Sequence, residues 1–152
     1  VPPGTGVLIL ATNHVEIFDN KIHYNRTMGT GIVCYLTVKQ YDDSLFNPYP
    51  SAIEVYNNDF KRAFGLPSIQ NDMGKLVLWK GGLNIPSIVY DGYVDPSLAV
   101  DGKLPADRAI CVHDNTNATF AMVDAANGFE NVSRDPAPFN CELSKLPEVV
   151  IP

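Results

Sequence analysis

The sequence is poor in basic charge and has no long apolar run. Eleven lysines and arginines stand against seventeen aspartates and glutamates, which gives a formal net charge of −6, and the basic residues are scattered. Such a chain has little with which to neutralise a phosphate backbone, so nucleic acid is not an expected partner. No apolar run approaches the roughly 20 residues that a membrane span needs, and no transmembrane segment is predicted.

Motifs that would identify a catalytic or cofactor site are also missing. The chain has no G-x-S-x-G elbow and no P-loop, which argues against a triad hydrolase and against a nucleotide-phosphate site. It has no C-x-x-C pair and no C-x-x-C-H sequence, so neither zinc nor covalently attached haem is predicted. We therefore expect no cofactor and assign no catalytic residue, and the sequence leaves open whether the chain is an enzyme.

The N-terminal residues lack an initiator methionine, a basic region and an apolar region. From this start we expect a processed or trimmed chain that has lost a leader or a larger N-terminal part. What is present is 152 residues, 45% of them apolar, which is enough for one domain with a real core, spanning 1–152.

A short pattern recurs three times in the chain. Residues 15–22, 53–60 and 110–117 share the order apolar, any, apolar, any, Asx, Asn. Alternation with period two and β-branched residues at the apolar sites are typical of a strand with one buried face. The side chains predicted to point inward are Val15, Ile17, Ile53, Val55, Ile110 and Val112.

The Asx-Asn pair that follows each of these strands predicts a sharp bend. Asparagine tolerates the left-handed backbone conformation, and its amide can bond the backbone of a neighbouring repeat. We therefore expect Asn20, Asn58 and Asn115 to stack as a ladder. Repeated strand, bend and strand units predict an all-β parallel β-helix of about three to four coils with long loops.

Other segments predict further elements around these repeats. Glycine-led apolar runs at 6–10 and 31–36, and the segment 87–90, favour strands. Residues 41–50 contain two prolines and are predicted to form a loop.

Two segments are predicted to lie outside the repeats. The spacing of Met73, Leu76 and Val77, with Ile69, predicts one short helix. Four prolines punctuate residues 133–152, and each removes a backbone donor, so this segment is predicted to be an extended tail that caps the last coil.

Residues 4–22, which contain the first repeat, resemble a family of bacterial right-handed parallel β-helix repeat proteins. Residues 88–96, 101–105 and 138–141 resemble the C-terminal region of the same family. The resemblance implies a right-handed β-helix and an extracytoplasmic location, whether periplasmic, outer-surface or secreted. Members of the family carry further coils before this point, so the resemblance implies that the chain is the C-terminal part of a longer protein. It also implies a dihaem c-type cytochrome as a candidate partner, and it supplies no catalytic residue.

Residues between the inward positions form two predicted outer columns. Phe18, Tyr56 and His113 make one column, an aromatic stripe that could stack on sugar rings or dock a partner. The alternative is that the loop 41–50 or the tail covers the stripe. Cover is the favoured interpretation because large exposed apolar patches are uncommon on monomers.

Glu16, Glu54 and Cys111 make the second outer column. Adjacent strands are about 4.8 Å apart, a spacing that suits the carboxylate pair of a retaining glycosidase. Nothing in the sequence indicates the burial that would tune one of the two carboxyls, so we expect Glu16 and Glu54 to be solvated.

Metal binding has no supporting motif. His14, His23 and His113 with Cys34 lack ligand spacing, and we expect scattered surface histidines. The aspartates could supply oxygen ligands to calcium, yet none follows a calcium-loop pattern.

The three cysteines suggest one disulfide and one leftover thiol. Cys111 faces outward in the predicted strand, within reach of a tail that crosses the outer face, so we predict a bond from Cys111 to Cys141. Cys34 is then a buried thiol, and an oxidising compartment is expected.

Two functional hypotheses follow. The first is an exported scaffold or protein-interaction module of unassigned activity, with a c-type cytochrome or another protein subunit as partner. The second is a polysaccharide-binding or polysaccharide-modifying β-helix protein, of the lyase or epimerase kind, with a glycan as ligand. The net charge of −6 argues against lyases of acidic glycans, which need basic residues to neutralise substrate carboxylates.

Overall fold

The computed structural model describes residues 1–38, 43–68, 75 and 84–147. Strands make up most of the regular secondary structure of these residues, and the helices among them are short. The strands are β1 (Thr5–Leu10), β2 (Asn13–Phe18), β3 (Lys21–Asn25), β4 (Met28–Val33), β5 (Ser51–Tyr56), β6 (Asp59–Arg62), β7 (Ile88–Tyr90), β8 (Ile110–His113) and β9 (Phe120–Met122). The helices are α1 (Tyr35–Val38) and the 3-10 turns η1 (Ala106–Arg108), η2 (Ala125–Asn127) and η3 (Ala137–Phe139).

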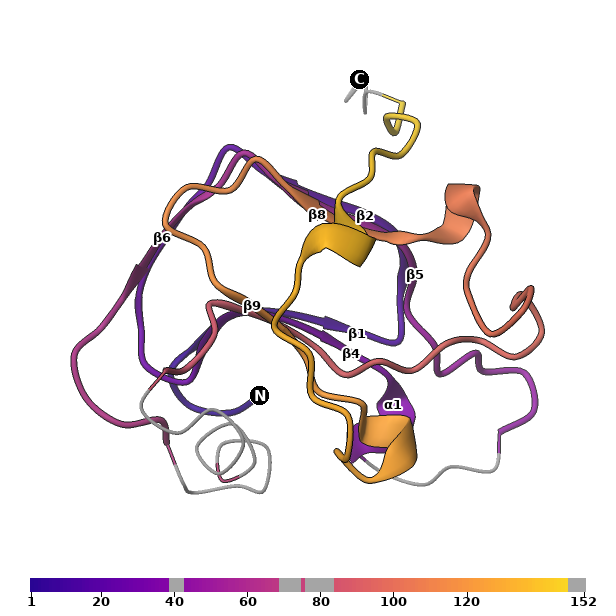
Figure 1. Ribbon diagram of the computed structural model, residues 1–152, viewed down its shortest axis with the longest axis horizontal. Helices are drawn as coiled ribbons and strands as arrows, with labels where there is room; N and C mark the ends of the chain where they lie inside the picture. Colours follow the sequence, from indigo (N-terminus) through magenta and orange to yellow (C-terminus); the bar gives the residue numbers. More distant parts are fainter. Residues whose placement is uncertain (39–42, 69–74, 76–83, 148–152) are drawn as a thin grey trace.

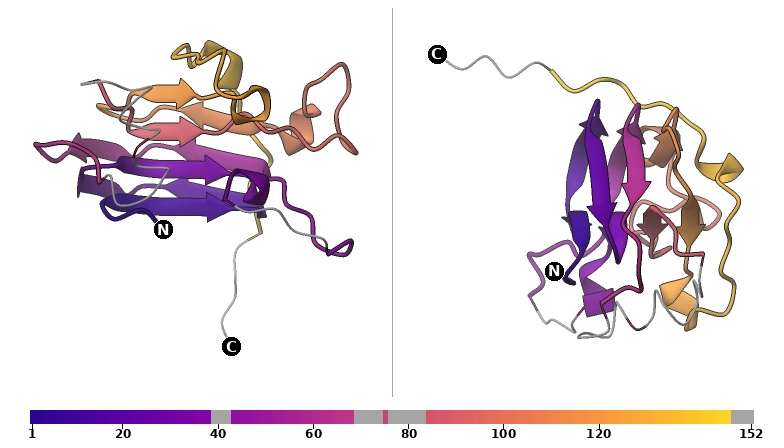
Figure 2. Two further views of the ribbon diagram at one scale, coloured as in Figure 1. Left: turned by 90° about the horizontal axis from the view of Figure 1, so that it is seen from below. Right: turned by 90° about the vertical axis from the view of Figure 1, so that its left-hand side faces the viewer.

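The strands pair in parallel and form three sheets. Their strand orders are β1-β4-β7-β9, β2-β5-β8 and β3-β6. The sheets lie around one interior (Figure 1), and within each sheet the strands stack in chain order (Figure 2). The predicted all-β class with parallel pairing is confirmed. The sheets do not form the regular solenoid that the repeat suggests, because they contain four, three and two strands with irregular segments between them.

The repeat sets the register of the three-stranded sheet. Val15 pairs with Ile53 and Ile53 with Ile110, as the shared pattern predicts. The apolar side chains of β5 and β8 belong to the main core, and those of β2 pack against it from the edge. A shift of one residue would turn these side chains outward, so their burial fixes the register.

Each strand of this sheet is followed by a residue in the left-handed backbone conformation and then by an asparagine. Asp19, Asn57 and Asp114 have φ of 56°, 52° and 49°. Asx residues adopt this conformation at lower cost than other residues with a Cβ, which explains the Asx-Asn pair at each bend.

The asparagines that follow form a hydrogen-bonded ladder. Asn20 donates through its backbone N–H and its side-chain amide to Asn58 Oδ1, and Asn58 donates in the same way to Asn115 Oδ1. The Asn58 amide also donates to the carbonyls of Ile17 and Tyr56, each at 2.8 Å. Asn58 is 1% exposed, so the ladder satisfies backbone groups that water does not reach.

Several predicted boundaries differ from the structure. The strand predicted at 31–36 ends at Val33, because the Cys34 N–H and the Thr37 hydroxyl both donate to the buried Asp91 carboxylate and draw the chain into α1. Burial raises the pKa of Asp91 to about 6, against the lowering effect of these hydrogen bonds. The helix predicted from Ile69, Met73, Leu76 and Val77 lies outside the described residues.

The described part of the tail, 133–147, lies against the body. Ser133 forms an isolated antiparallel bridge with Met122 of β9, and η3 follows. The Phe139 ring lies 4.8 Å from Phe120 and 5.8 Å from Tyr90, so it closes the core at the β9 end. Beyond η3 the tail runs extended across the strands (Figure 2). Among the described residues, no helix has the length and apolar character needed to cross a membrane.

Asn58→Ala tests the ladder. The substitution leaves buried carbonyls without donors, and we expect unfolding free energy to fall by about 2–4 kcal/mol. Asn20→Ala removes the exposed end of the ladder and is the matched control, with an expected loss under about 1 kcal/mol. Urea denaturation measures both, and equal losses would contradict a ladder that depends on its buried member.

Candidate functional site

The outer face of the β2-β5-β8 sheet gathers the polar and aromatic side chains that the sequence singles out. Glu16 pairs with Glu54, and Glu54 pairs with Cys111. Two residues later in each strand, the same pairing joins Phe18 to Tyr56 and Tyr56 to His113. The two columns therefore lie side by side on the outer face, as the repeat predicts.

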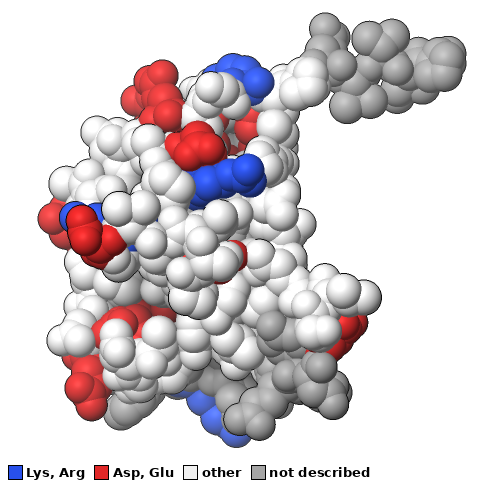
Figure 3. All heavy atoms as spheres, turned by 90° about the vertical axis from the view of Figure 1, so that its right-hand side faces the viewer, with Lys and Arg blue, Asp and Glu red and all other residues white. Residues whose placement is uncertain are grey.

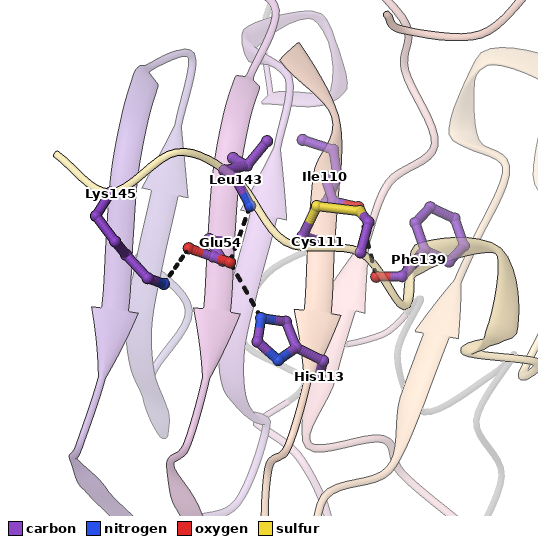
Figure 4. The surroundings of a disulfide bond; sticks show 8 residues. Glu54, Ile110, Cys111, His113, Phe139, Leu143 and Lys145 are labelled. Carbon is purple, nitrogen blue, oxygen red and sulfur yellow. Dashed lines mark hydrogen bonds and ion pairs between the residues drawn. A yellow bond between two sulfur atoms is a disulfide. The ribbon is translucent and has the colours of Figure 1, made fainter. Parts of the chain in front are cut away.

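The tail crosses this face. A disulfide joins Cys111 of β8 to Cys141, as predicted, and the chain then runs over β5 towards β2 (Figure 4). Cys111 is fully buried under this crossing, and Cys34 is the buried free thiol.

Glu54 is the anchor of the tail. Its side chain is 0% exposed, and its carboxylate accepts hydrogen bonds from the Leu143 N–H at 3.1 Å and from Lys145 Nζ at 2.9 Å. His113 Nε2 lies 3.1 Å from the same carboxylate, and Figure 4 shows all three groups pointing towards it. Burial by itself would raise the pKa of Glu54, but the bonds from Lys145, His113 and Leu143 outweigh burial and hold the pKa below its ordinary 4.5.

His113 and Lys145 respond to the same carboxylate. His113 lies between Glu54 and Asp114, whose Oδ2 is 2.8 Å from Nδ1. Burial lowers the pKa of His113, yet the two carboxylates outweigh it and raise the pKa above 6.5. The bond to Glu54 likewise raises the pKa of Lys145. The site is therefore a charged cluster whose members stabilise one another.

The predicted solvation of Glu54 is wrong. The tail lies over it, and the Glu16 side chain is 14% exposed, with Oε1 3.7 Å from Lys145 Nζ. Lys145 Nζ thus lies between the two carboxylates, hydrogen-bonded to Glu54 and 3.7 Å from Glu16.

The aromatic column is a continuous stack. The Phe18 and Tyr56 ring centroids are 5.2 Å apart, those of Tyr56 and His113 are 5.3 Å apart, and all three rings are nearly parallel. Lys145 Nζ lies 3.7 Å from the Tyr56 ring centroid, a cation–π contact. Tyr56 and His113 are half-buried, whereas Phe18 is 43% exposed.

The histidines do not converge on a metal site. His14 Nε2 lies 3.4 Å from Arg108, His23 bonds Asp59, and His113 bonds Glu54 and Asp114. Burial raises the pKa of Cys34 to about 11, so it is a poor thiolate ligand. Within the described residues, no group of three or more His, Cys, Asp or Glu side chains could hold a metal ion.

A hollow remains between the tail and the sheet, and we call it the tail groove. Its volume is about 210 Å³. Its lining consists of Val15, Glu16 and Ala52 on the sheet, His14, Asp107 and Arg108 at one wall, and Leu143, Ser144 and Leu146 of the tail. The tail therefore does not fill the surface that it crosses.

Sequence reasoning missed Leu143 and Lys145, which complete the site. Neither belongs to a motif, and the predicted disulfide was the available signal, because it places the tail over this face. Comparison with protein-family models, with curated proteins and with solved structures finds no match for this chain. The family resemblance therefore stays a prediction.

Glu54→Gln tests the anchor. The variant keeps the shape of the side chain but loses its charge, and we expect unfolding free energy near neutral pH to fall by roughly 1–3 kcal/mol. Because the folded pKa of Glu54 is lowered, its contribution is present above 4.5 and is lost as pH falls through the folded pKa.

The difference between wild type and Glu54→Gln is therefore expected to shrink as urea denaturation is moved from about pH 5.5 to about pH 3. Glu130→Gln, at an exposed carboxylate, is the control and is expected to match wild type. A gap that stays constant or widens over this range would contradict the anchor.

Proposed function

We propose that the three sheets are the walls of a short, irregular, right-handed parallel β-helix. The in-register parallel pairing of β2, β5 and β8 supports this proposal, as does the asparagine ladder that links their bends. Right-handed crossovers between parallel strands are the general rule, and they give the hand.

On this frame, the protein serves as a non-enzymatic scaffold that binds another protein. The observation that carries this proposal is the chemistry at Glu54, which holds an extended protein segment through a backbone N–H, an ammonium group and an adjacent ring. These are the contacts by which proteins recognise peptides. Glu54 and His113 both hydrogen-bond protein groups, which supports a structural role for this cluster.

The partner and the compartment come from the resemblance and from the disulfide. A disulfide persists in oxidising surroundings, which supports an extracytoplasmic location. The family resemblance proposes a c-type cytochrome as partner. On the face in Figure 3, acidic and basic side chains are scattered among uncharged ones, which does not favour a polyanionic partner there.

The glycan alternative has less support. Sugar binding by an aromatic platform needs an open ring face, and the Tyr56 ring is stacked against Phe18 and His113 and covered by Lys145. In the aromatic stripe, Phe18 is the ring with the most surface open to a ligand.

Affinity capture from an extract of the producing cells tests the proposal. We expect the immobilised 152-residue chain to retain a protein that stains for covalent haem on a denaturing gel. Phe18→Ala is expected to lower retention by about tenfold or more, since burying one phenylalanine contributes roughly 1.5–3 kcal/mol. Phe64→Ala, at a phenylalanine that is fully exposed, is the control.

Retention of no haem protein by the wild-type chain would overturn the cytochrome partner. Saturable binding to a glycan panel that disappears in Phe18→Ala, with no protein retained, would establish the alternative instead.

A further inference from the structure

The tail beyond the disulfide rests on the surface and belongs to no sheet. Within 142–147 the structure has no strand or helix, and all residues except Leu143 are exposed. Its polar contacts to the body run to Glu54 and Glu16, with the Tyr56 ring beside them. Segments with few buried contacts open readily, and a second segment that supplies the same donors to Glu54 would offset the bonds lost by the tail, so this stretch is suited to exchange.

Many different sequences could make the contacts that the tail makes with Glu54. Glu54 accepts from one backbone N–H, which almost any residue supplies, and from one ammonium group two residues later. We call Glu16, Glu54 and Tyr56 the cation subsite. Any extended segment with a lysine at the right place can satisfy this subsite.

The cation subsite demands a positive charge. Glu54 is 0% exposed, and Glu16 Oε1 is buried without a hydrogen bond, facing Lys145 at 3.7 Å. Two neighbouring carboxylates and a ring face attract an ammonium group, and leaving a buried carboxylate unpaired is costly. His113 alone would remain beside Glu54 if the tail lifted.

The tail leaves part of the tail groove unfilled. The hollow of about 210 Å³ under Leu143, Ser144 and Leu146 runs beside the cation subsite, from Glu16 to the wall at His14 and Arg108. A segment with bulkier side chains flanking its lysine would bury more apolar surface there and displace water, which favours binding.

We infer that the tail groove with its cation subsite is a recognition site for an extended, lysine-bearing segment of a partner protein, and that Lys145 occupies it in cis. This inference rests on the proposed interaction role and names the chemistry of the partner. The tail competes with the partner segment for Glu54.

Chemical rescue tests the cation subsite in the full chain. Lys145→Ala removes three carbons and the ammonium group, and n-propylammonium supplies both. We expect n-propylammonium to raise the urea midpoint of Lys145→Ala in a saturable way, as a ligand of the folded state does. It is expected to leave wild type and the exposed-site control Lys103→Ala unmoved, and 1-propanol is expected to rescue none of them.

A peptide measures recognition in trans. The labelled sequence of residues 142–147, Glu-Leu-Ser-Lys-Leu-Pro, is expected to bind Lys145→Ala about tenfold tighter than wild type, because its own tail no longer fills the subsite. Methionine in place of the peptide lysine, or Glu54→Gln added to the protein, is expected to abolish the gain. If Lys145→Ala is unstable, the experiment uses Lys145→Met instead, which keeps the aliphatic stem and lacks the charge.

Equal effects of n-propylammonium on Lys145→Ala and Lys103→Ala, or equal peptide affinity for Lys145→Ala and wild type, would overturn the inference. The two proposals fail separately. If a haem protein is captured equally well by Glu54→Gln and n-propylammonium gives no rescue, only the groove inference is overturned. If n-propylammonium rescues Lys145→Ala but no haem protein is captured, only the cytochrome partner is overturned.

Discussion

A buried carboxylate has to be given donors, and Glu54 imposes this constraint on the whole outer face. An ionised group removed from water is costly unless hydrogen bonds and opposite charge replace its hydration. Here the donors come from β8 through His113 and from the tail through Leu143 and Lys145. The path of the tail, the raised pKa of His113 and the partial cover over the aromatic column all depend on that one side chain.

The repeat places Glu54 where the tail can reach it. Parallel pairing sets Cys111 beside Glu54 and Glu54 beside Glu16, so the disulfide attaches the tail one strand away from the anchor. Four extended residues from Cys141 to Lys145 span about 13 Å, and two strand spacings require roughly 10 Å. The geometry of a crossing chain therefore delivers Lys145 between the two glutamates.

The sequence predicted those features that a local pattern encodes, namely the inward positions of β5 and β8, the bends at the Asx-Asn pairs and the disulfide that ties down the tail. It did not predict the burial of Glu54, because an outward position in a strand is indistinguishable from a solvated one until a distant segment covers it. It also missed β9, whose three residues are too few for alternation to register, and α1, whose start depends on the remote carboxylate of Asp91.

The contact between Lys145 and the Tyr56 ring gives the most direct test of whether the tail lies over Glu54. An ammonium group 3.7 Å from a ring centroid places the adjacent Cε protons in the shielding region of that ring. Proton NMR of the chain is predicted to show the Lys145 Cε protons shifted upfield of the other lysines, and Tyr56→Leu is predicted to abolish that shift. Lys145 resonances at the position of a solvated lysine would show that the tail does not occupy the subsite and would contradict the account.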